Sequence, residues 1–560
     1  MLEKIENIFN EILEKNGIQQ LKISKSNRPD LCDFQCNEVF KLAKSLNMAP
    51  MDIGNKIVKV INEYPLFNKY FKEVSFVMPG FINIKVSDYI INETIRESYL
   101  DYGIKKVSDK KTYFLDYGGY NIAKPLHIGH LRPSIIGESI KRIIEYKGHK
   151  VIADVHLGDF GLQMGQVIYG ILKDNKNIDD IDINYLNEIY PKISGLCKEN
   201  EEVKLECERI TKELQDGNPE YTKIWNKIYQ VSLDDIKELC NYLDIHFDLW
   251  QGEYDSREYF DTLEKLLNDK KLLVKSDGAL VVDVKKETDN KPMPPMMFKK
   301  SNGGYVYDST DLATIYERVT KYHPDYILYV TDFRQNLHFE QVFRVSSLLE
   351  LMPYNNLIHA YNGTINGTDG KPFKTRKGDA PKLRELFEMV KETFVSLKES
   401  NKDMSEEDLD IITNAIIKFA DLSNSRDKDY IFDVEKFSNV IGKTGPYILY
   451  TYLRINKVIK NNMYKELSDT IYNDADRNLR MKLLELPYSF EAAFKEYKPH
   501  YIAEYLYNLC VEANNFYENN HINSCDDQAK LNDWLYVLDF TNKIIKDMLS
   551  LLMINIPSKM

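Results

Sequence analysis

The segment 121–132 holds the side chains best suited to phosphate chemistry, because two histidines and a lysine lie close together around a glycine. His127 and His130 are three residues apart, so at the start of a helix they project to the same side and can donate to phosphate oxygens as a transition state builds charge. Lys124 adds a cation, and Gly129 leaves room for a flat base against the backbone. A helix that begins here also presents unpaired N–H groups and a partial positive charge. These residue types at this spacing predict a nucleotide phosphate site.

A strand and a helix must position this segment. Lys111–Tyr117 is typical of a buried strand, Leu131–Lys147 of a helix, and Lys150–Val155 of a second strand. Strand–helix–strand units predict a parallel sheet covered by helices. A bare His-x-x-His is more often a pair of surface histidines, and it is the strand–loop–helix setting that favours a functional site. Further strands are predicted at Gly278–Val284, Tyr326–Val330 and Ile358–Tyr361.

A second basic segment, Gly370–Gly378, is suited to bind a triphosphate. Four cations fall within seven of its residues, between glycines that allow the backbone to move. A loop of this kind can close on phosphates and stabilise their charge. On composition alone, the alternative is a solvated surface loop.

The whole chain is long enough for several domains, since 560 residues correspond to three or four units of about 150 residues. In the first hundred residues, Val74–Met78 and Phe81–Val86 alternate around the Pro79–Gly80 turn and predict antiparallel pairing. From about residue 384 onward nearly every stretch is typical of a helix. We expect an N-terminal domain at 1–108, a nucleotide-binding domain at 109–383 with an insertion at about 170–300, a helical junction at 384–439 and a helical domain at 440–560.

Charge is unevenly distributed along the chain. The net charge is −12, yet residues 101–150 carry ten basic and five acidic side chains, while residues 151–250 carry ten basic and twenty acidic ones. Because salt screens each charge within roughly 8–10 Å, a local basic surface can bind phosphates on an acidic protein. The acidic total therefore excludes no class of partner.

Seven cysteines are scattered along the chain without a Cys-x-x-Cys pair. This number and spacing argue against a zinc ribbon and against a disulfide framework. No apolar run approaches the ~20 residues that span a bilayer, and the N-terminus is typical of an amphipathic helix without a leader pattern. We expect a cytoplasmic protein with reduced thiols and no membrane partner.

The motifs together resemble one enzyme family. His127–His130 resembles the HIGH signature of class I aminoacyl-tRNA synthetases, and the longer run Asn121–Arg132 is similar to that of the arginyl-tRNA synthetase family. The resemblance extends from about residue 30 to the C-terminus. Further segments that match the family are Pro79–Asn83, Gly158–Gly165, Tyr307–Ala313, Ala420–Ser423, Asp429–Asp433 and Thr444–Tyr447.

This resemblance implies an arginine–tRNA ligase that uses ATP, carried with Mg²⁺, to activate L-arginine and transfer it to tRNA-Arg. It also implies an α/β fold: a class I Rossmann-type core with a helical insertion, an N-terminal α+β domain and a C-terminal all-α helical bundle. The implied catalytic residues are His127, His130, Lys124, Lys374 and Arg376. The implied ATP-binding residues are His127, Gly129, His130, His338, Phe373 and Lys374. The implied arginine-binding residues are Asp116, Asn121, His127, Tyr307, Asp311, Gln335 and, as a weaker candidate, Glu253.

The chemistry of these residue types agrees with the implied substrate. A guanidinium is planar, permanently charged and forked, so it favours a carboxylate and aromatic walls, which Asp311 and Tyr307 provide. An isolated Tyr-x-x-x-Asp is more often a helix cap beside a core tyrosine. The 371–377 loop resembles the KMSKS loop of the class, but Thr375 stands where the second lysine is usual. The resemblance implies that Lys124 takes over the role of that lysine.

The helical domain departs from the family pattern. Leu449 replaces a usual glutamine, Thr451–Leu453 replace Ala-His-Ala, and Lys443 replaces a common asparagine. Two alternatives to a ligase therefore stay open: a paralogue that delivers activated arginine to another acceptor, and a non-catalytic tRNA-binding relative. We expect a monomer without a structural metal; Gly442–Thr444 lacks the leading glycine of a P-loop, and the spacing of Asp154, His156 and Asp159 does not enforce a metal site.

Overall fold

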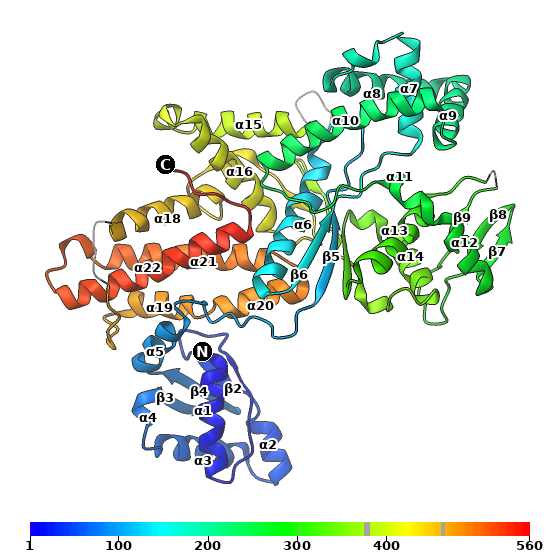
Figure 1. Ribbon diagram of the computed structural model, residues 1–560. Coiled ribbons are helices and arrows are strands. Elements are labelled where there is room, and N and C mark those ends of the chain that lie inside the picture. Colours follow the sequence, from blue (N-terminus) through cyan, green and yellow to red (C-terminus); the bar gives the residue numbers. More distant parts are fainter. Residues whose placement is uncertain (302, 374–380, 461–464) are drawn as a thin grey trace. The chain divides into compact units, whose positions relative to one another are not determined.

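The computed structural model describes residues 1–301, 303–373, 381–460 and 465–560, and the chain divides into two compact units (Figure 1). The first unit comprises residues 1–105, 451–489 and 505–546. The second comprises residues 106–450, 490–504 and 547–560, and it contains the predicted phosphate site. Each unit is described by itself.

A parallel four-stranded sheet lies at the centre of the second unit. Its strands are β5 (Thr112–Tyr117), β6 (Lys150–Asp154), β10 (Tyr326–Val330) and β11 (Leu357–His359). They are ordered β11-β10-β5-β6, and every neighbouring pair is parallel. All four strands were predicted from sequence, and the predicted Rossmann-type core is confirmed.

This strand order places a switch point between β5 and β10. The chain leaves β5 through α6 (Ile128–Lys147) toward β6, and it leaves the adjacent β10 through α14 (Asn336–Leu348) toward β11 on the other side. At such a switch point the two loops diverge beyond the carboxyl ends of the strands, which is where open α/β sheets bind ligands. The predicted histidine motif lies where the first of these loops enters α6, and Gln335–His338 lies where the second enters α14.

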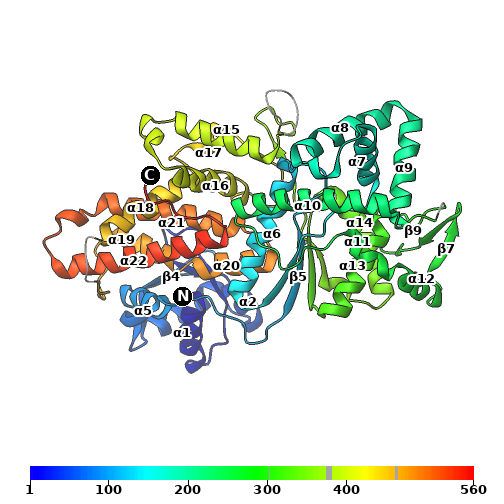
Figure 2. The ribbon, with the colours of Figure 1, turned by 45° about the horizontal axis from the view of Figure 1, so that its top comes forward.

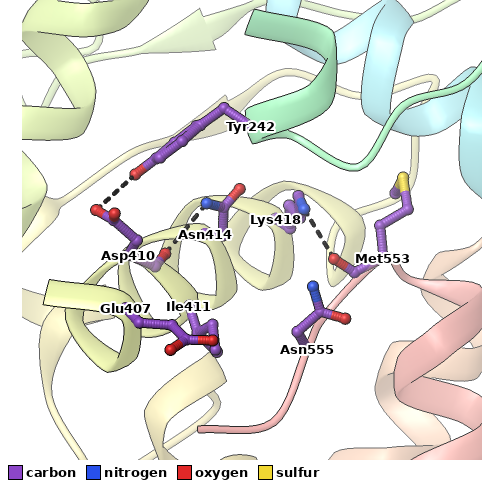
Figure 3. Close-up of a pocket in the computed structure, with 8 residues that line it drawn as sticks. All are labelled: Tyr242, Glu407, Asp410, Ile411, Asn414, Lys418, Met553 and Asn555. Atoms are coloured by element: carbon purple, nitrogen blue, oxygen red, sulfur yellow. Dashed lines mark hydrogen bonds between the residues drawn. The ribbon is translucent and has the colours of Figure 1, made fainter. Parts of the chain in front are cut away.

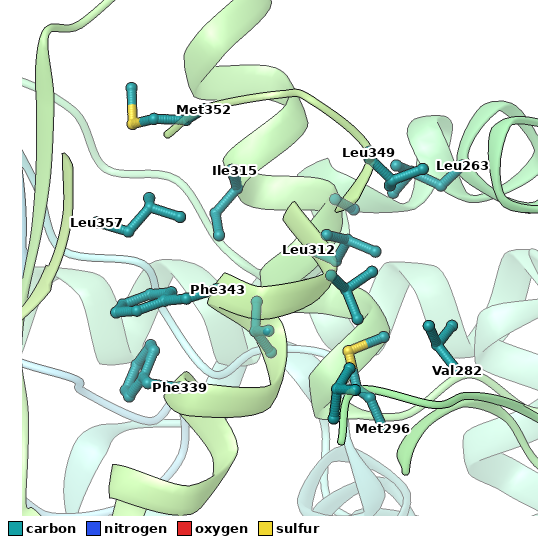
Figure 4. Close-up of a cluster of buried hydrophobic side chains, with 14 of the residues drawn as sticks. Leu263, Val282, Met296, Leu312, Ile315, Phe339, Phe343, Leu349, Met352 and Leu357 are labelled. Carbon is teal, nitrogen blue, oxygen red and sulfur yellow. The ribbon is translucent and has the colours of Figure 1, made fainter. Parts of the chain in front are cut away.

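Side chains of β5 alternate between the two faces of the sheet. Tyr117 faces α6, where a Cβ on Gly137 would come within 2.2 Å of the Tyr117 ring, so only glycine allows this approach. Phe114 faces the opposite side and belongs to a buried cluster with α13 (Tyr307–Tyr322) and α14 (Figure 4). The sheet is therefore covered on both faces, as Figures 1 and 2 also show.

Two insertions follow β6. The first is helical, as predicted for residues 170–300, and the second adds a small antiparallel sheet ordered β7-β8-β9. The helices are α7 (Leu162–Lys173), α8 (Ile183–Glu199), α9 (Glu201–Gln215), α10 (Pro219–Tyr242), α11 (Glu253–Ser256) and α12 (Phe260–Asp269); the strands are β7 (Leu273–Ser276), β8 (Ala279–Val282) and β9 (Met296–Lys299).

Beyond the sheet the described chain is mainly helical, as predicted, with one short parallel pair that the sequence did not reveal. This pair joins β12 (Ile365–Asn366) to β13 (Tyr430–Ile431). The helices are α15 (Leu383–Ser396), α16 (Glu406–Leu422), α17 (Val434–Ser438), α18 (Gly445–Lys460), α19 (Asp474–Leu483), α20 (Leu486–Glu496), α21 (His500–Asn519) and α22 (Gln528–Leu551).

The first unit contains an antiparallel sheet ordered β1-β2-β4-β3. The predicted pairing around Pro79–Gly80 is present, because β3 runs antiparallel to β4. None of the described helices, in either unit, is long and apolar enough to cross a membrane. The elements of this N-terminal part are α1 (Leu2–Lys15), β1 (Ile23–Lys25), β2 (Phe34–Cys36), α2 (Val39–Leu46), α3 (Pro50–Asn62), α4 (Phe67–Tyr70), β3 (Phe71–Val77), β4 (Phe81–Val86) and α5 (Asp88–Ser98).

Candidate active site

The backbone at the start of α6 determines which nitrogen of each histidine carries a proton. His127 is the N-cap residue, and its Nδ1 accepts a hydrogen bond of 3.0 Å from the Gly129 N–H. The N–H of His127 in turn donates to Nδ1 of His130 at 3.2 Å. Because both Nδ1 atoms are acceptors, each neutral ring carries its proton on Nε2. The two rings, with centroids 4.1 Å apart, therefore offer a pair of Nε2–H donors beside a helix N-terminus.

Both histidines are neutral near pH 7. Burial lowers the pKa of His130 to about 3, and the charges of His127 and Lys124 act in the same direction. Burial also lowers the pKa of His127, with the Lys124 ammonium as the second cause. The pair can thus donate hydrogen bonds without gaining or losing charge across the physiological pH range.

The loop before α6 is held in a constrained conformation. Ala123 has a φ of +62°, a region that non-glycine residues rarely adopt, and its N–H donates to Ser232 Oγ of α10 at 3.0 Å. Asn121 bridges to Gly158, where a Cβ would lie 2.5 Å from Asn121 Oδ1. Lys124 extends toward the insertion, with Nζ 5.1 Å from the ring centroid of Tyr190 in α8. The loop geometry thus depends on the insertion as well as on the sheet.

A carboxylate–histidine cluster lies at the adjoining ends of α13 and α14. His338 is bonded on both sides, through Nδ1 to Asp308 at 2.5 Å and through Nε2 to Asp311. Burial alone would lower the pKa of His338, but the two carboxylates raise it to about 10. Burial raises the pKa of Asp311, and the bond and charge of His338 outweigh it and leave that pKa below its usual value. The resemblance assigned His338 to ATP and Asp311 to arginine; the structure brings them into direct contact.

Asp116 has a different neighbour from the one expected. Its Oδ2 accepts a 2.6 Å hydrogen bond from Arg318, which also donates to Asp154 at 2.9 Å. Arg318 is fully buried, and its guanidinium lies 4.6 Å from the Phe114 ring centroid. The carboxylate of Asp116 is therefore paired with a buried arginine of the protein itself, Arg318.

The other predicted residues differ in burial. Burial raises the pKa of Glu253, at the start of α11, to about 7; the charge of His156 opposes this shift and the charge of Asp311 adds to it. Tyr307, the first residue of α13, is 63% exposed. Gln335 is exposed just before α14. Phe373 is buried against Phe432, with centroids 5.7 Å apart. Lys374 and Arg376 lie outside the described residues.

Sequence reasoning missed three residues that shape the site: Arg318, Tyr190 and Asp308. Arg318 follows Asp311 by seven residues, so it lies two turns along the same face of α13. This position on the same face as Asp311 was a usable signal. Tyr190 gave no signal, because its proximity to Lys124 depends on how the helical insertion folds back.

Comparisons with known proteins agree along the whole chain. Residues 94–434 match the family "tRNA synthetases class I (R), catalytic domain", residues 448–560 match "DALR anticodon binding domain" and residues 1–86 match "Arginyl tRNA synthetase N terminal domain". The arginine–tRNA ligase of Alkaliphilus oremlandii is 38% identical over the full length of both chains. That of Agathobacter rectalis is 37% identical over 96% of both. The chain belongs to the arginyl-tRNA synthetase family.

Solved structures of arginyl-tRNA synthetases have the same fold. The Plasmodium falciparum enzyme matches with a TM-score of 0.81 and 27% identity, covering 100% of this chain and 99% of that one. The Thermus thermophilus arginyl-tRNA synthetase matches over the full length of both chains with a TM-score of 0.78 at 20% identity, which supports the fold alone. The predicted family, fold class and enzyme class, an arginine–tRNA ligase, are confirmed. Class I tRNA synthetases use ATP.

One family motif has a structural explanation here. Arg132, which ends the extended histidine motif, forms a buried ion pair of 3.0 Å with Asp421 in α16 and donates to the carbonyl of Lys428 at 2.9 Å. Thr364 N–H donates to Asp429 Oδ1 at 2.7 Å, beside the β12–β13 pair. The synthetase motifs around 420–433 thus fix α6 and the strand that leads to the 371–377 loop.

Two of the cavities formed by the described residues lie away from the histidine pair. One, of about 670 Å³, is lined by residues of 367–373 and 432–435, including Phe373. The other, of about 480 Å³, lies between the end of α10, α16 and residues 553–555, and none of the predicted site residues lines it (Figure 3). Among the described residues, no cluster of three or more histidine, cysteine or acidic side chains could hold a metal ion.

Proposed function

We propose that the chain catalyses arginine–tRNA ligation at the switch point between β5 and β10. The carboxylate of L-arginine attacks the α-phosphate of ATP, forming arginyl-adenylate and releasing pyrophosphate. The 3′ terminal adenosine of tRNA-Arg then accepts the arginyl group. No side-chain nucleophile is required, because catalysis rests on holding the reactants together and on stabilising phosphate charge.

The neutral pair of Nε2–H donors on His127 and His130 is the observation that carries this proposal. Donors fixed by backbone hydrogen bonds lose little freedom when charge develops on the phosphates, so they favour the transition state. The N-terminus of α6 and Lys124 act on the same charge, while Gly129 admits the adenine. Mg²⁺ would enter with ATP, held mainly by phosphate oxygens, since no described cluster offers a protein cage.

Arginine recognition is assigned to the cluster at the start of α13. Asp311 and Glu253 supply negative charge for the guanidinium, Tyr307 supplies an aromatic wall, and Asn121 and Gln335 supply amide partners. Asp116 supports the start of α13 indirectly, because its carboxylate accepts a hydrogen bond from Arg318 of the same helix. The 371–377 loop, with Lys374 and Arg376, would close on the triphosphate.

The tRNA is assigned to the remaining domains. Residues 440–560 would bind the anticodon stem and residues 1–108 the elbow, in keeping with the families that these regions match. The family resemblance implies that arginine activation requires bound tRNA. We further propose a cytoplasmic monomer.

An aminoacylation screen of the standard amino acids with unfractionated tRNA tests this function. The proposal expects arginine alone to be attached, to tRNA-Arg. Arginyl-adenylate formation without tRNA charging would favour a paralogue that serves another acceptor, an alternative that the altered 443–453 segment keeps open. Absence of both reactions would favour a non-catalytic relative.

A further inference from the structure

Two cysteines of the helical insertion lie in contact. Cys197 is near the end of α8 and Cys207 is in the middle of α9. Their sulfur atoms are 3.6 Å apart, joined by a thiol hydrogen bond. Cys207 is fully buried and Cys197 is 8% exposed, so only Cys197 offers an edge to solvent.

The backbone around the pair forms a tight hairpin. α8 ends at Glu199 and α9 begins at Glu201, with Asn200 between them. Asn200 Oδ1 accepts hydrogen bonds from the N–H groups of Glu202 and Val203 at 2.9 and 3.2 Å, which fixes the start of α9. The two sulfurs therefore face each other across a short, ordered connection. A disulfide requires them to approach from 3.6 Å to about 2 Å, a change within reach of small side-chain and helix movements.

We propose that Cys197 and Cys207 are a modification site at which a hydroperoxide forms a reversible disulfide. The Cys197 sulfur attacks the peroxide, the O–O bond breaks, and the alcohol or water leaves with the thiol proton, so that a sulfenic acid remains on Cys197. The Cys207 sulfur then attacks the Cys197 sulfur, the S–O bond breaks, and the hydroxyl leaves as water with the Cys207 proton. The two thiols lose two electrons in total, and the hydroperoxide gains them.

The order of these steps follows from burial. Burial raises the pKa of the Cys207 thiol, and the neighbouring Cys197 raises it further, so Cys207 stays protonated and is a poor first nucleophile. Cys197 carries the exposed edge and meets the oxidant first. Cys207 is then already in contact with the sulfenic acid, which favours the disulfide over further oxidation.

The disulfide would act on the phosphate site through α8. A Cβ on Gly165 would lie 2.2 Å from the Cys207 carbonyl, so α7 and α9 are packed together at backbone level. Because this contact anchors α9, we expect any helix movement that brings the two sulfurs together to fall mainly on α8. Tyr190 lies two turns before Cys197 on α8, and its ring centroid is 5.1 Å from Lys124 Nζ. Oxidation would thus move the Tyr190 ring that lies beside Lys124 Nζ. The effect of this movement on catalysis rests on the function proposed above.

Hydrogen peroxide treatment of the full-length enzyme, followed by non-reducing peptide mapping, tests the site. We expect a Cys197–Cys207 cross-link, a loss of two free thiols per chain, and full recovery with dithiothreitol. Cys197→Ser should abolish the cross-link, while Cys525→Ser, which removes a more exposed thiol, should leave it intact. A Cys197 sulfinic acid with unmodified Cys207, or no cross-link in the wild-type enzyme, would overturn the proposal.

Activity measured on the same samples tests the connection to Lys124. We expect arginine attachment by the oxidised enzyme to fall by roughly 10- to 100-fold, because a displacement of about 1 Å in a positioned group costs that much, and to return on reduction. Unchanged activity in the cross-linked enzyme would overturn the route through Tyr190. Failure of the proposed function would appear separately, as absent charging by the reduced enzyme.

Discussion

At the scale of single residues, the two histidines of the α6 motif show what spacing reveals and what it does not. The His127–His130 spacing, together with its strand–loop–helix setting, predicted donors that face a phosphate. It did not predict that both rings are neutral Nε2–H donors. That property comes from the N-cap geometry, in which backbone N–H groups occupy both Nδ1 atoms.

Asp311→Asn tests the charge assigned to the guanidinium. The variant keeps the shape of the side chain but removes its charge, and breaking a buried charged hydrogen bond costs about 2–5 kcal/mol. We therefore expect kcat/KM for arginine to fall by about 30-fold or more. Lysine should not replace arginine as substrate, since it has a point charge and no fork.

Asp308→Asn is the matched control. Asp308 holds the other side of His338, so this variant loosens the same histidine without removing the charge proposed to face arginine. The KM for arginine should stay near its wild-type value. Equal increases in KM for both variants would show that Asp311 acts only by holding His338.

Glu253 makes arginine binding dependent on pH. Since burial raises its pKa to about 7, the carboxyl gains its negative charge as the pH rises from 6 to 8. A cationic substrate is then attracted more strongly, so KM for arginine should fall over this range by up to about tenfold. Glu253→Gln, measured at the same pH values, should remove this dependence. A pH profile of KM that persists in Glu253→Gln would exclude the role.

Asp116 marks the limit of reasoning from residue type. As a carboxylate at the end of a strand it was a reasonable partner for a guanidinium. Its actual partner is the guanidinium of Arg318, which is 202 positions away in the chain. Only the packing of α13 against β5 brings them together, and no local pattern encodes that packing.

At the scale of elements, the parallel strands were predictable because each is a short, largely apolar run. The β12–β13 pair was not, since two residues per strand carry no periodicity. The burial of an ionisable side chain inside a helix was equally hard to predict from the sequence. Lys418, in the middle of α16, is 1% exposed, and its Nζ donates to the carbonyl of Met553 at 2.7 Å.

Lys418 should make stability depend on pH. Burial lowers its pKa to about 7 from 10.5, so between these values the unfolded chain binds a proton that the folded chain does not. The free energy of unfolding attributable to this group therefore rises with pH from 7 to 10.5, by up to about 4 kcal/mol. Lys418→Met should be more stable than wild type at pH 7, and the difference should shrink by pH 10. Urea unfolding at pH 7, 8.5 and 10 measures it, and a constant difference would contradict the neutral lysine.

At the scale of the whole molecule, tRNA binding should promote the chemistry of arginine activation. Contacts with tRNA far from the active site can help to position the ATP phosphates. The free energy of tRNA binding then increases the rate of arginine activation. We expect arginine-dependent ATP–pyrophosphate exchange near background without tRNA-Arg and strong exchange when it is added. Robust exchange without tRNA would refute the coupling and favour the paralogue.

Point variants suit this experiment better than a truncation. Residues 490–504 and 547–560 belong to the same compact unit as the catalytic sheet, so deleting 440–560 would remove part of that unit. The Lys418 bond to Met553 would be lost as well. A better variant is Arg454→Ala, because Arg454 is the one residue of the family's Ala-His-Ala-Arg segment retained here. We expect this variant to need a higher tRNA concentration for half-maximal exchange. Its exchange rate at saturating tRNA should stay near that of the wild type.

The central claim is that the neutral histidine pair at the start of α6 stabilises phosphate charge during arginine activation. The most direct test is arginine-dependent ATP–pyrophosphate exchange with saturating tRNA-Arg, in the wild-type enzyme and in His127→Ala and His130→Ala. Losing one donor to a developing charge typically lowers the rate ~10²–10³-fold, so kcat should fall by that factor while the KM for arginine changes much less. If both variants keep a near-normal kcat, the active site lies elsewhere and the account is wrong.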